Sequence, residues 1–364
     1  FGSAKDLYEK GWQYYDGGIY DLAVECYLKS AEQGNADAQC NLGKCYYEGK
    51  GVEQDYEKAV EWYHKSAEQG NADAQCQLGI CYENGKGVKQ DYEKAVEWYH
   101  KSAEQGYASA QYNLGNCYYN GEGVEKNYKK AVEWYRKVAE RGYAEAQCNL
   151  GNCYSVQLNY KKAVEWYLKS AEQGYAVAQF NLGNRYYNGG GIQQDYKKAV
   201  EWYLKSAEQG YAEAQCNLGF CYYNGKGVKQ DYKKAVEWWL KAAEQGYATA
   251  QYNLGFCYYN GTGVKQNYEK AAEWYLKSAE QGDAEAQCQL GFCYFNGKGV
   301  KQDYEKAVEW YLKSAEQGHA EAQFNLGECY ENGRGVKRYL IKAFRWYIKA
   351  ADQGHEEARK KVNY

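Results

Sequence analysis

The sequence contains no proline and no methionine, no long apolar run and no large excess of either charge. Because no apolar stretch approaches the roughly 18 residues that a spanning helix needs, we expect no membrane span. A formal net charge of −3 argues against a nucleic-acid partner, which usually requires a basic surface. Hydrophobic residues at 45% exclude a disordered chain. Without methionine, Phe1 is not a translation start, which predicts a processed product or part of a longer chain.

Motifs of common catalytic and metal sites are also missing. The patterns S-x-x-K, G-x-S-x-G and H-E-x-x-H do not occur. There is no C-x-x-C, and none of the four histidines has a known ligand spacing to a cysteine or carboxylate. The recurring Gly-x-Gly segments follow no predicted strand, so they are not phosphate loops. We therefore expect no enzyme activity, no cofactor and no metal.

What the sequence does contain is a repeat. Its leading glycines are 36 residues apart, except for 32 residues from Gly2 to Gly34 and from Gly142 to Gly174. Such dense repetition predicts a solenoid rather than separate globules. The predicted segments are a short N-terminal capping repeat (1–33), three full repeats (34–141), a short repeat (142–173), five full repeats (174–353) and a C-terminal capping helix (354–364).

Each repeat predicts two helices. When the leading glycine is numbered 0, alanine, leucine and tyrosine recur at positions 4, 8 and 12, on one helix face. The Gly-x-Gly-Val segment at positions 15–18 then ends this helix. An aspartate such as Asp231 immediately precedes the next periodic pattern of apolar residues, which predicts that it caps the N-terminus of a second helix. One hairpin cannot bury its apolar face alone, so neighbouring repeats must stack.

The pattern A-x-A-Q-x-x-L-G-x-x-Y-x-x-G-x-G-V-x-x-D-Y-x-K-A-x-x-W-Y resembles the Sel1-like repeat, a relative of the tetratricopeptide repeat, over residues 34–353. The family usually has proline after Gly-Val, where this chain has residues such as Glu53 or Lys229. The two short repeats look closer to the tetratricopeptide type. The resemblance implies an all-α, right-handed superhelical solenoid with first helices along its concave face. It also implies an adaptor role between proteins.

The 14 cysteines recur mainly at positions 6 and 11 of the first helix. Cys40 and Cys45 are five residues apart, which places them about 7.5 Å along the axis and about 140° around it, too divergent for a disulfide. Position 6 also accepts phenylalanine or tyrosine, so these cysteines are interpreted as small core residues. Some relatives carry disulfides between helices, but only Cys26 lies on a second helix here. Free thiols favour a cytoplasmic location; a secreted or periplasmic one is the alternative, because signal cleavage also removes the initiator methionine.

The variable positions 3, 6, 10 and 13 lie opposite the Ala-Leu-Tyr face of the first helix. In tetratricopeptide relatives this stripe faces the concave groove. Aromatic residues fill positions 10 and 13 of three successive repeats, the polar middle has asparagine at position 10, and position 3 is largely acidic. The predicted groove residues are Phe220, Tyr223, Phe256, Tyr259, Phe292, Phe295, Tyr187, Asn184, Asn152, Asn116, Glu213 and Glu285.

Two interpretations of these residues stay open. Aromatic rings beside an acidic edge favour an extended peptide with apolar and basic side chains. The rings could equally pack against neighbouring repeats. Position 14 holds asparagine before glycine, which predicts either a helix C-cap or contact with a bound backbone.

The favoured function is a non-catalytic scaffold that binds an extended peptide or partner segment in its groove. A carbohydrate or cell-wall binder is the second candidate, because aromatic faces beside amides also suit sugars. A structural array that self-associates through its tyrosine-rich surface is the third. Lys10 in place of the core leucine, and charged residues after Gly354, predict polar ends and favour a monomer.

Overall fold

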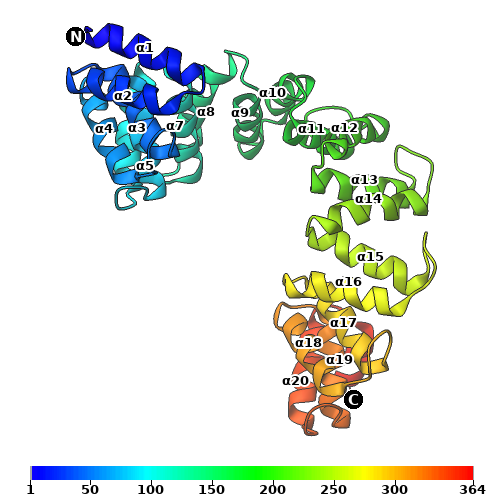
Figure 1. Cartoon of the computed structure of the whole chain (residues 1–364). Coiled ribbons are helices and arrows are strands. Elements are labelled where there is room, and N and C mark those ends of the chain that lie inside the picture. The colour runs from blue at the N-terminus through cyan, green and yellow to red at the C-terminus, as the bar shows by residue number, and fades with distance from the viewer. Residues whose placement is uncertain (1, 364) are drawn as a thin grey trace. The chain divides into compact units, whose positions relative to one another are not determined.

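A computed structural model describes residues 2–363, and they fold into α-helices joined by short loops, with no strand in that range (Figure 1). The chain divides into two compact units, one ending at Gln173 and the other beginning at Gly174. Within each unit, consecutive helices pack on one another. None of the described helices is both long and apolar enough to cross a membrane. The prediction of an all-α solenoid of stacked helix pairs is confirmed.

The helices follow the repeat. The unit ending at Gln173 contains α1 (Ala4–Asp16), α2 (Tyr20–Glu32), α3 (Ala36–Glu48), α4 (Tyr56–Glu68), α5 (Ala72–Asn84), α6 (Tyr92–Glu104), α7 (Ala108–Asn120), α8 (Tyr128–Ala139), α9 (Ala144–Val156) and α10 (Tyr160–Glu172). The unit beginning at Gly174 contains α11 (Ala176–Asn188), α12 (Tyr196–Glu208), α13 (Ala212–Asn224), α14 (Tyr232–Glu244), α15 (Ala248–Asn260), α16 (Tyr268–Glu280), α17 (Ala284–Asn296), α18 (Tyr304–Glu316), α19 (Ala320–Asn332), α20 (Leu340–Asp352) and α21 (Glu356–Val362).

Side chains cap several of the helix ends. Asp231 accepts a hydrogen bond from the Lys234 amide at 3.0 Å, which confirms the predicted N-cap of α14. First helices in full repeats end at a left-handed glycine such as Gly225, with φ of 68°. The amide of Asn224 donates to the Phe220 carbonyl at 3.0 Å. The capping interpretation of position 14 therefore holds at this end of α13.

The Leu-Gly pair at positions 8 and 9 sets how closely the two helices of a repeat approach. Leu290 is buried, and the neighbouring Gly291 packs under the ring of Tyr311 from α18. A Cβ at Gly291 would come within 2.7 Å of that ring, closer than side chains tolerate. Glycine is therefore required here by helix contact rather than by its backbone angle.

Within each unit, the second glycine of a Gly-x-Gly loop lies against the backbone of the preceding repeat. Gly299 has φ of 71°, and a Cβ there would collide with the carbonyl oxygen of Tyr268 in the preceding repeat. The loop therefore packs directly against the backbone of the preceding repeat at Tyr268. In the short repeat, which lacks this loop, Leu158 has φ of 60° where the opening repeat has Gly18.

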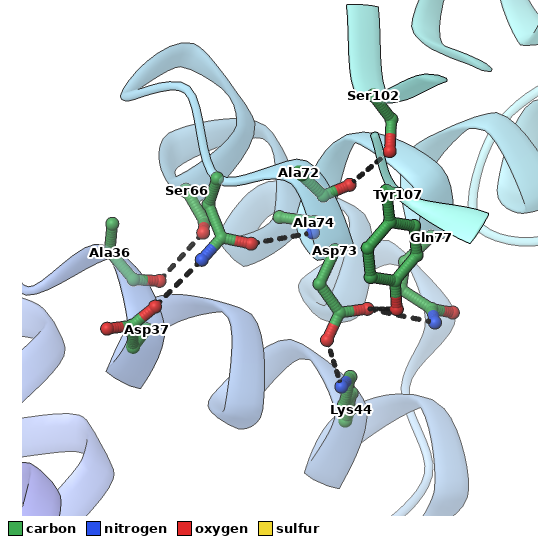
Figure 2. Close-up of polar contacts among 11 residues, drawn as sticks. Ala36, Asp37, Lys44, Ser66, Ala72, Asp73, Ala74, Gln77, Ser102 and Tyr107 are labelled. Atoms are coloured by element: carbon green, nitrogen blue, oxygen red, sulfur yellow. Dashed lines mark hydrogen bonds and ion pairs between the residues drawn. The ribbon is translucent and has the colours of Figure 1, made fainter. Parts of the chain in front are cut away.

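The repeated serines and cysteines are core residues. The hydroxyl of Ser66 is fully buried and donates to the Ala36 carbonyl at 2.7 Å, and Ser102 does the same to Ala72, as Figure 2 shows. All 14 cysteines except Cys26 are buried. Burial raises the pKa of the Cys76 thiol to about 12. The interpretation of the cysteines as core residues is confirmed, and the repeated serines share that role.

A ladder of glutamines crosses the interfaces between repeats. Gln75 donates to the Ala67 carbonyl at 3.1 Å, and its side-chain oxygen accepts from Gln105 at 2.8 Å. The ladder is interrupted at Gln111. Arg141 occupies the position at which the other repeats have the donating glutamine. Arg141 donates to the Gly106 carbonyl instead, and the buried Oε1 of Gln111 has no partner.

We expect Arg141→Gln to stabilise the chain by about 1 kcal/mol, because the buried Gln111 oxygen gains a hydrogen bond. Urea unfolding followed by circular dichroism measures the change. Arg345→Gln, a change at an exposed arginine, serves as the control. Equal stability changes in the two variants would contradict the expectation.

The C-terminal end is less polar than predicted. Helix α21 is largely charged, as expected, but α20 exposes Leu340, Ile341, Phe344 and Ile348. The prediction of a polar end therefore holds for α21, on whose residues it depended, but does not extend to α20. Helix α21 packs on α20, yet these four side chains stay exposed.

Candidate binding groove

The variable positions of the first helices line three equivalent pockets. Each pocket lies between two successive first helices, with the tyrosine of the intervening second helix forming part of its wall. The lining residues are Trp12, Tyr15, Tyr27, Asn41, Lys44 and Glu48 (about 310 Å³); Asn116, Tyr119, Asn120, Tyr135, Asn149 and Asn152 (about 320 Å³); and Asn184, Tyr187, Asn188, Tyr203, Asn217, Phe220 and Asn224 (about 300 Å³). The first two lie in the unit ending at Gln173 and the third in the unit beginning at Gly174.

Hydrogen bonds orient the asparagines in these pockets. The Tyr203 hydroxyl donates to Oδ1 of Asn184 at 2.7 Å, and Asn217 donates to the same oxygen at 3.2 Å. Tyr135 donates to Asn116 in the equivalent pocket at 2.5 Å. Burial raises the pKa of Tyr203, so its hydroxyl is protonated and donates at neutral pH. Two donors therefore hold the side-chain oxygen of Asn184, which lines the pocket.

Sequence reasoning missed the asparagine at position 7. Asn149 and Asn217 line two of the pockets, and position 7 is asparagine or glutamine in every full repeat. Its angle on the helix places it beside positions 3 and 10. A fixed amide next to variable positions was the signal that could have revealed it.

The aromatic positions divide between exposure and packing. Phe256 and Phe292 are each 39% exposed. Phe220 is half-buried, and its ring meets Trp239 edge-on with centroids 5.3 Å apart. Phe292 also lies 6.4 Å from Tyr259 of the preceding repeat. Position 10 therefore presents accessible rings in these two repeats.

At position 13 the rings are packed against the core more than the exposed rings at position 10 are. Tyr223 and Tyr259 are half-buried, and each meets the first tyrosine of its own second helix edge-on at 5.0 Å. Phe295 does the same with Tyr304. The packing interpretation therefore holds at position 13, whereas position 10 leaves two rings exposed. Ligand binding by any of these residues stays a prediction.

The acidic residues at position 3 connect neighbouring repeats. Asn71 donates to Asp37 at 2.9 Å, and Tyr107 donates to Asp73 at 3.0 Å, as Figure 2 shows. Although burial alone would raise the pKa of Asp73, an ion pair with Lys44 lowers it. These two carboxylates therefore stabilise the stacking of neighbouring repeats, whether or not they also line the edge of a binding groove.

The two predicted acidic groove residues differ in exposure. Glu213 is half-buried, whereas Glu285 is exposed. Burial, and then the charge of Glu285, raise the pKa of the Tyr252 hydroxyl in the preceding repeat. Of the pair, Glu285 is the one open to a ligand.

Comparison with known proteins decides the family. The Sel1 repeat family matches ten consecutive segments: residues 4–35, 36–71, 72–107, 108–143, 144–175, 176–211, 212–247, 248–283, 284–319 and 320–355. The chain is a Sel1 repeat protein. Proteins of this family are generally non-catalytic scaffolds for protein interactions. No match was found among curated proteins.

Two solved structures resemble this Sel1 repeat protein. A protective antigen from uropathogenic Escherichia coli is 37% identical, with a TM-score of 0.69 over 100% of this chain and 87% of that one. A Sel1 repeat protein from Oxalobacter formigenes is 31% identical, with a TM-score of 0.50 over 93% and 89% of the two chains. Both support the stacked-repeat fold.

Proposed function

We propose that this Sel1 repeat protein binds an extended segment of a partner protein along the groove residues of its first helices, without catalysing a reaction. The observation that carries the proposal is the recurrence of one pocket geometry, with amide donors beside an aromatic wall. An extended peptide presents carbonyl groups and alternating side chains at a regular rise of about 3.3 Å per residue. It can therefore meet equivalent pockets repeatedly, as a compact ligand cannot.

In the unit beginning at Gly174, two kinds of groove residue would have different tasks. The amide N–H groups of Asn184 would donate to backbone carbonyls, because Tyr203 and Asn217 already hold its oxygen. The exposed rings of Phe256 and Phe292 would take apolar side chains. The exposed carboxylate of Glu285 would favour lysine or arginine in the ligand. The free, buried thiols support a cytoplasmic setting for this interaction.

The test begins with 12-residue peptides selected from a random display library against the intact protein. We expect Phe256→Ala and Phe292→Ala each to weaken the selected peptide by at least about tenfold in calorimetry, because aromatic anchors dominate such interfaces. Asn184→Asp should also weaken it, since the change removes amide donors while keeping the side-chain shape. Both phenylalanine variants should stay folded, because the rings are largely accessible.

Tyr92→Ala is the matched control, because Tyr92 is also 39% exposed but lies at the start of a second helix. Its affinity for the peptide should not change. Normal binding by all three groove variants would overturn the proposal. A glycan array tests the carbohydrate alternative, for which aromatic rings beside amides are the supporting feature. Saturable glycan binding lost in Asn184→Asp would favour it.

A further inference from the structure

A further pocket lies between α16 and α17, apart from the groove. We define the α16 pocket by residues of α16, of α17 and of the loop that follows α17: Glu269, Ala272, Glu273, Leu276, Leu290 and Val300. Its volume is about 270 Å³. Leu290 stands at position 8 of its repeat, on the helix face opposite the variable groove positions. The α16 pocket is therefore separate from the groove.

A single residue opens this pocket. Position 26 is valine in every other repeat except the last, which has Phe344, whereas here it is Ala272. In the next repeat, Val308 belongs to a buried cluster against which Tyr330 and Val336 pack. Alanine lacks the two methyl groups with which valine fills that space, and interiors leave few such voids. The α16 pocket therefore follows from Ala272 rather than from the repeat itself.

The inner surface of the pocket is apolar. Ala272 and Leu290 are buried, and Leu276 and Val300 are half-buried. Contact of an aliphatic group with these side chains is favourable, because it removes apolar surface from water. The interior thus suits an aliphatic stem.

The rim of the pocket is negatively charged. Glu269 and Glu273 are exposed and four residues apart on α16, so their carboxylates lie on one helix face and repel each other. Among the described residues, no lysine or arginine forms an ion pair with either glutamate. Lys298 of the following repeat has its Nζ over the ring of Tyr268, 4.6 Å from the ring centre. A bound cation would relieve the repulsion between the two carboxylates.

An apolar interior beneath two carboxylates fits an arginine side chain. The aliphatic stem of arginine can lie on apolar surface while its charged group stays at an exposed rim. The planar guanidinium group carries five N–H donors and can bind two carboxylates at once. It is also more weakly hydrated than the compact ammonium group of lysine, so it loses less hydration in a partly apolar pocket.

We infer that the α16 pocket is a second interaction site, separate from the groove, that takes an arginine side chain of a partner protein. Glu269 and Glu273 pair with the guanidinium group, and Leu276, Leu290 and Val300 contact the stem. The inference does not depend on the proposed groove function, because none of the predicted groove residues lines this pocket.

The probe is a short glycine peptide with a central arginine. One twin carries citrulline, which keeps the shape without the charge, and another carries lysine. Because a single side chain binds weakly, titration of the full chain is followed by NMR of labelled leucine and valine methyl groups. We expect the arginine peptide to shift the resonances of Leu276, Leu290 and Val300 and to bind at least about tenfold more tightly than the citrulline peptide. The lysine peptide should bind more weakly than the arginine peptide.

Ala272→Val introduces the residue that most other repeats have and fills the pocket. The variant should stay folded by circular dichroism and bind the arginine peptide at least about tenfold more weakly. The double variant Glu269→Gln with Glu273→Gln keeps the pocket but removes its charge. It should weaken binding by a similar factor.

The neighbouring repeats supply matched controls. In α18, Val308 lies between Glu305 and Glu309, the same acidic pair, so Val308→Ala should create a second site for the arginine peptide. In α14, Lys233 replaces the first glutamate of the pair. Val236→Ala should therefore open a pocket there without adding an arginine site.

Each of four results would overturn the inference. Equal affinity for the arginine and citrulline peptides would show that the pocket takes an uncharged group, and equal affinity for the lysine peptide would show that any cation suffices. Undiminished binding by Ala272→Val would place the site elsewhere. A dimer in light scattering that Ala272→Val abolishes, without binding of the arginine peptide, would make a second copy of the chain the occupant.

Discussion

Gly299→Ala should cost about 3 kcal/mol of unfolding free energy, one of the largest effects of any single small substitution in this chain. Its φ of 71° is costly for alanine, by about 1–2 kcal/mol. The added methyl group also collides with the Tyr268 carbonyl, and overpacking of this kind typically costs about 1–3 kcal/mol more. Urea unfolding monitored by circular dichroism measures the loss.

Gly318→Ala separates these two causes. Gly318 has φ of 92°, but a Cβ there would meet nothing within 4 Å. We expect only the conformational cost of about 1–2 kcal/mol at this site. Equal losses at Gly299 and Gly318 would show that the loop does not rest on the preceding repeat.

Raising the pH to about 10.5 should unfold the protein, because the folded state keeps its buried thiols protonated. Burial raises the pKa of Cys76 and of Cys288 to about 12, against about 8.5 for a thiol in an unfolded chain. Their stabilising contribution is therefore complete below pH of about 8.5 and is lost as the pH rises toward about 12. Each such thiol removes about 1.4 kcal/mol per pH unit within that window.

The effect is large because the core thiols titrate together. All cysteines except Cys26 are buried, and a typical domain is stable by only about 5–15 kcal/mol. A pH titration followed by circular dichroism gives the midpoint. The variant Cys76→Phe with Cys288→Phe uses the residue that this chain has at Phe180 and Phe324, and its midpoint should lie at higher pH. An unchanged midpoint would contradict a role for the thiols.

Features within one repeat were predictable from sequence, whereas features between repeats were not. The N-cap Asp231 and the buried Ser66 depend on spacing inside a repeat, and periodicity reveals that spacing. The contact of Gly299 with Tyr268 depends on how one repeat sits on the next. No pattern along the chain encodes that placement directly.

The groove residues likewise divide into features that the sequence predicted and features that depend on a neighbouring helix or repeat. Helical angles placed positions 10 and 13 on one stripe, and Asn116, Asn152, Asn184 and Tyr187 do line pockets. The different exposure of Phe256 and Tyr259 follows from the neighbouring second helix, which shields position 13 with Tyr268 but leaves position 10 accessible. Likewise, the acidic position 3 was expected at a ligand edge, yet Asp37 and Asp73 accept hydrogen bonds from the following repeat.

The most direct test of the groove as a binding surface is site-specific photo-crosslinking. A benzophenone amino acid replaces Phe256, Phe292 or Tyr92, and the crosslinked products in a native extract are identified by mass spectrometry. We predict that positions 256 and 292 capture nearby residues of one extended partner segment and that position 92 does not capture it. Capture of that segment from position 92 but from neither groove position would contradict the account.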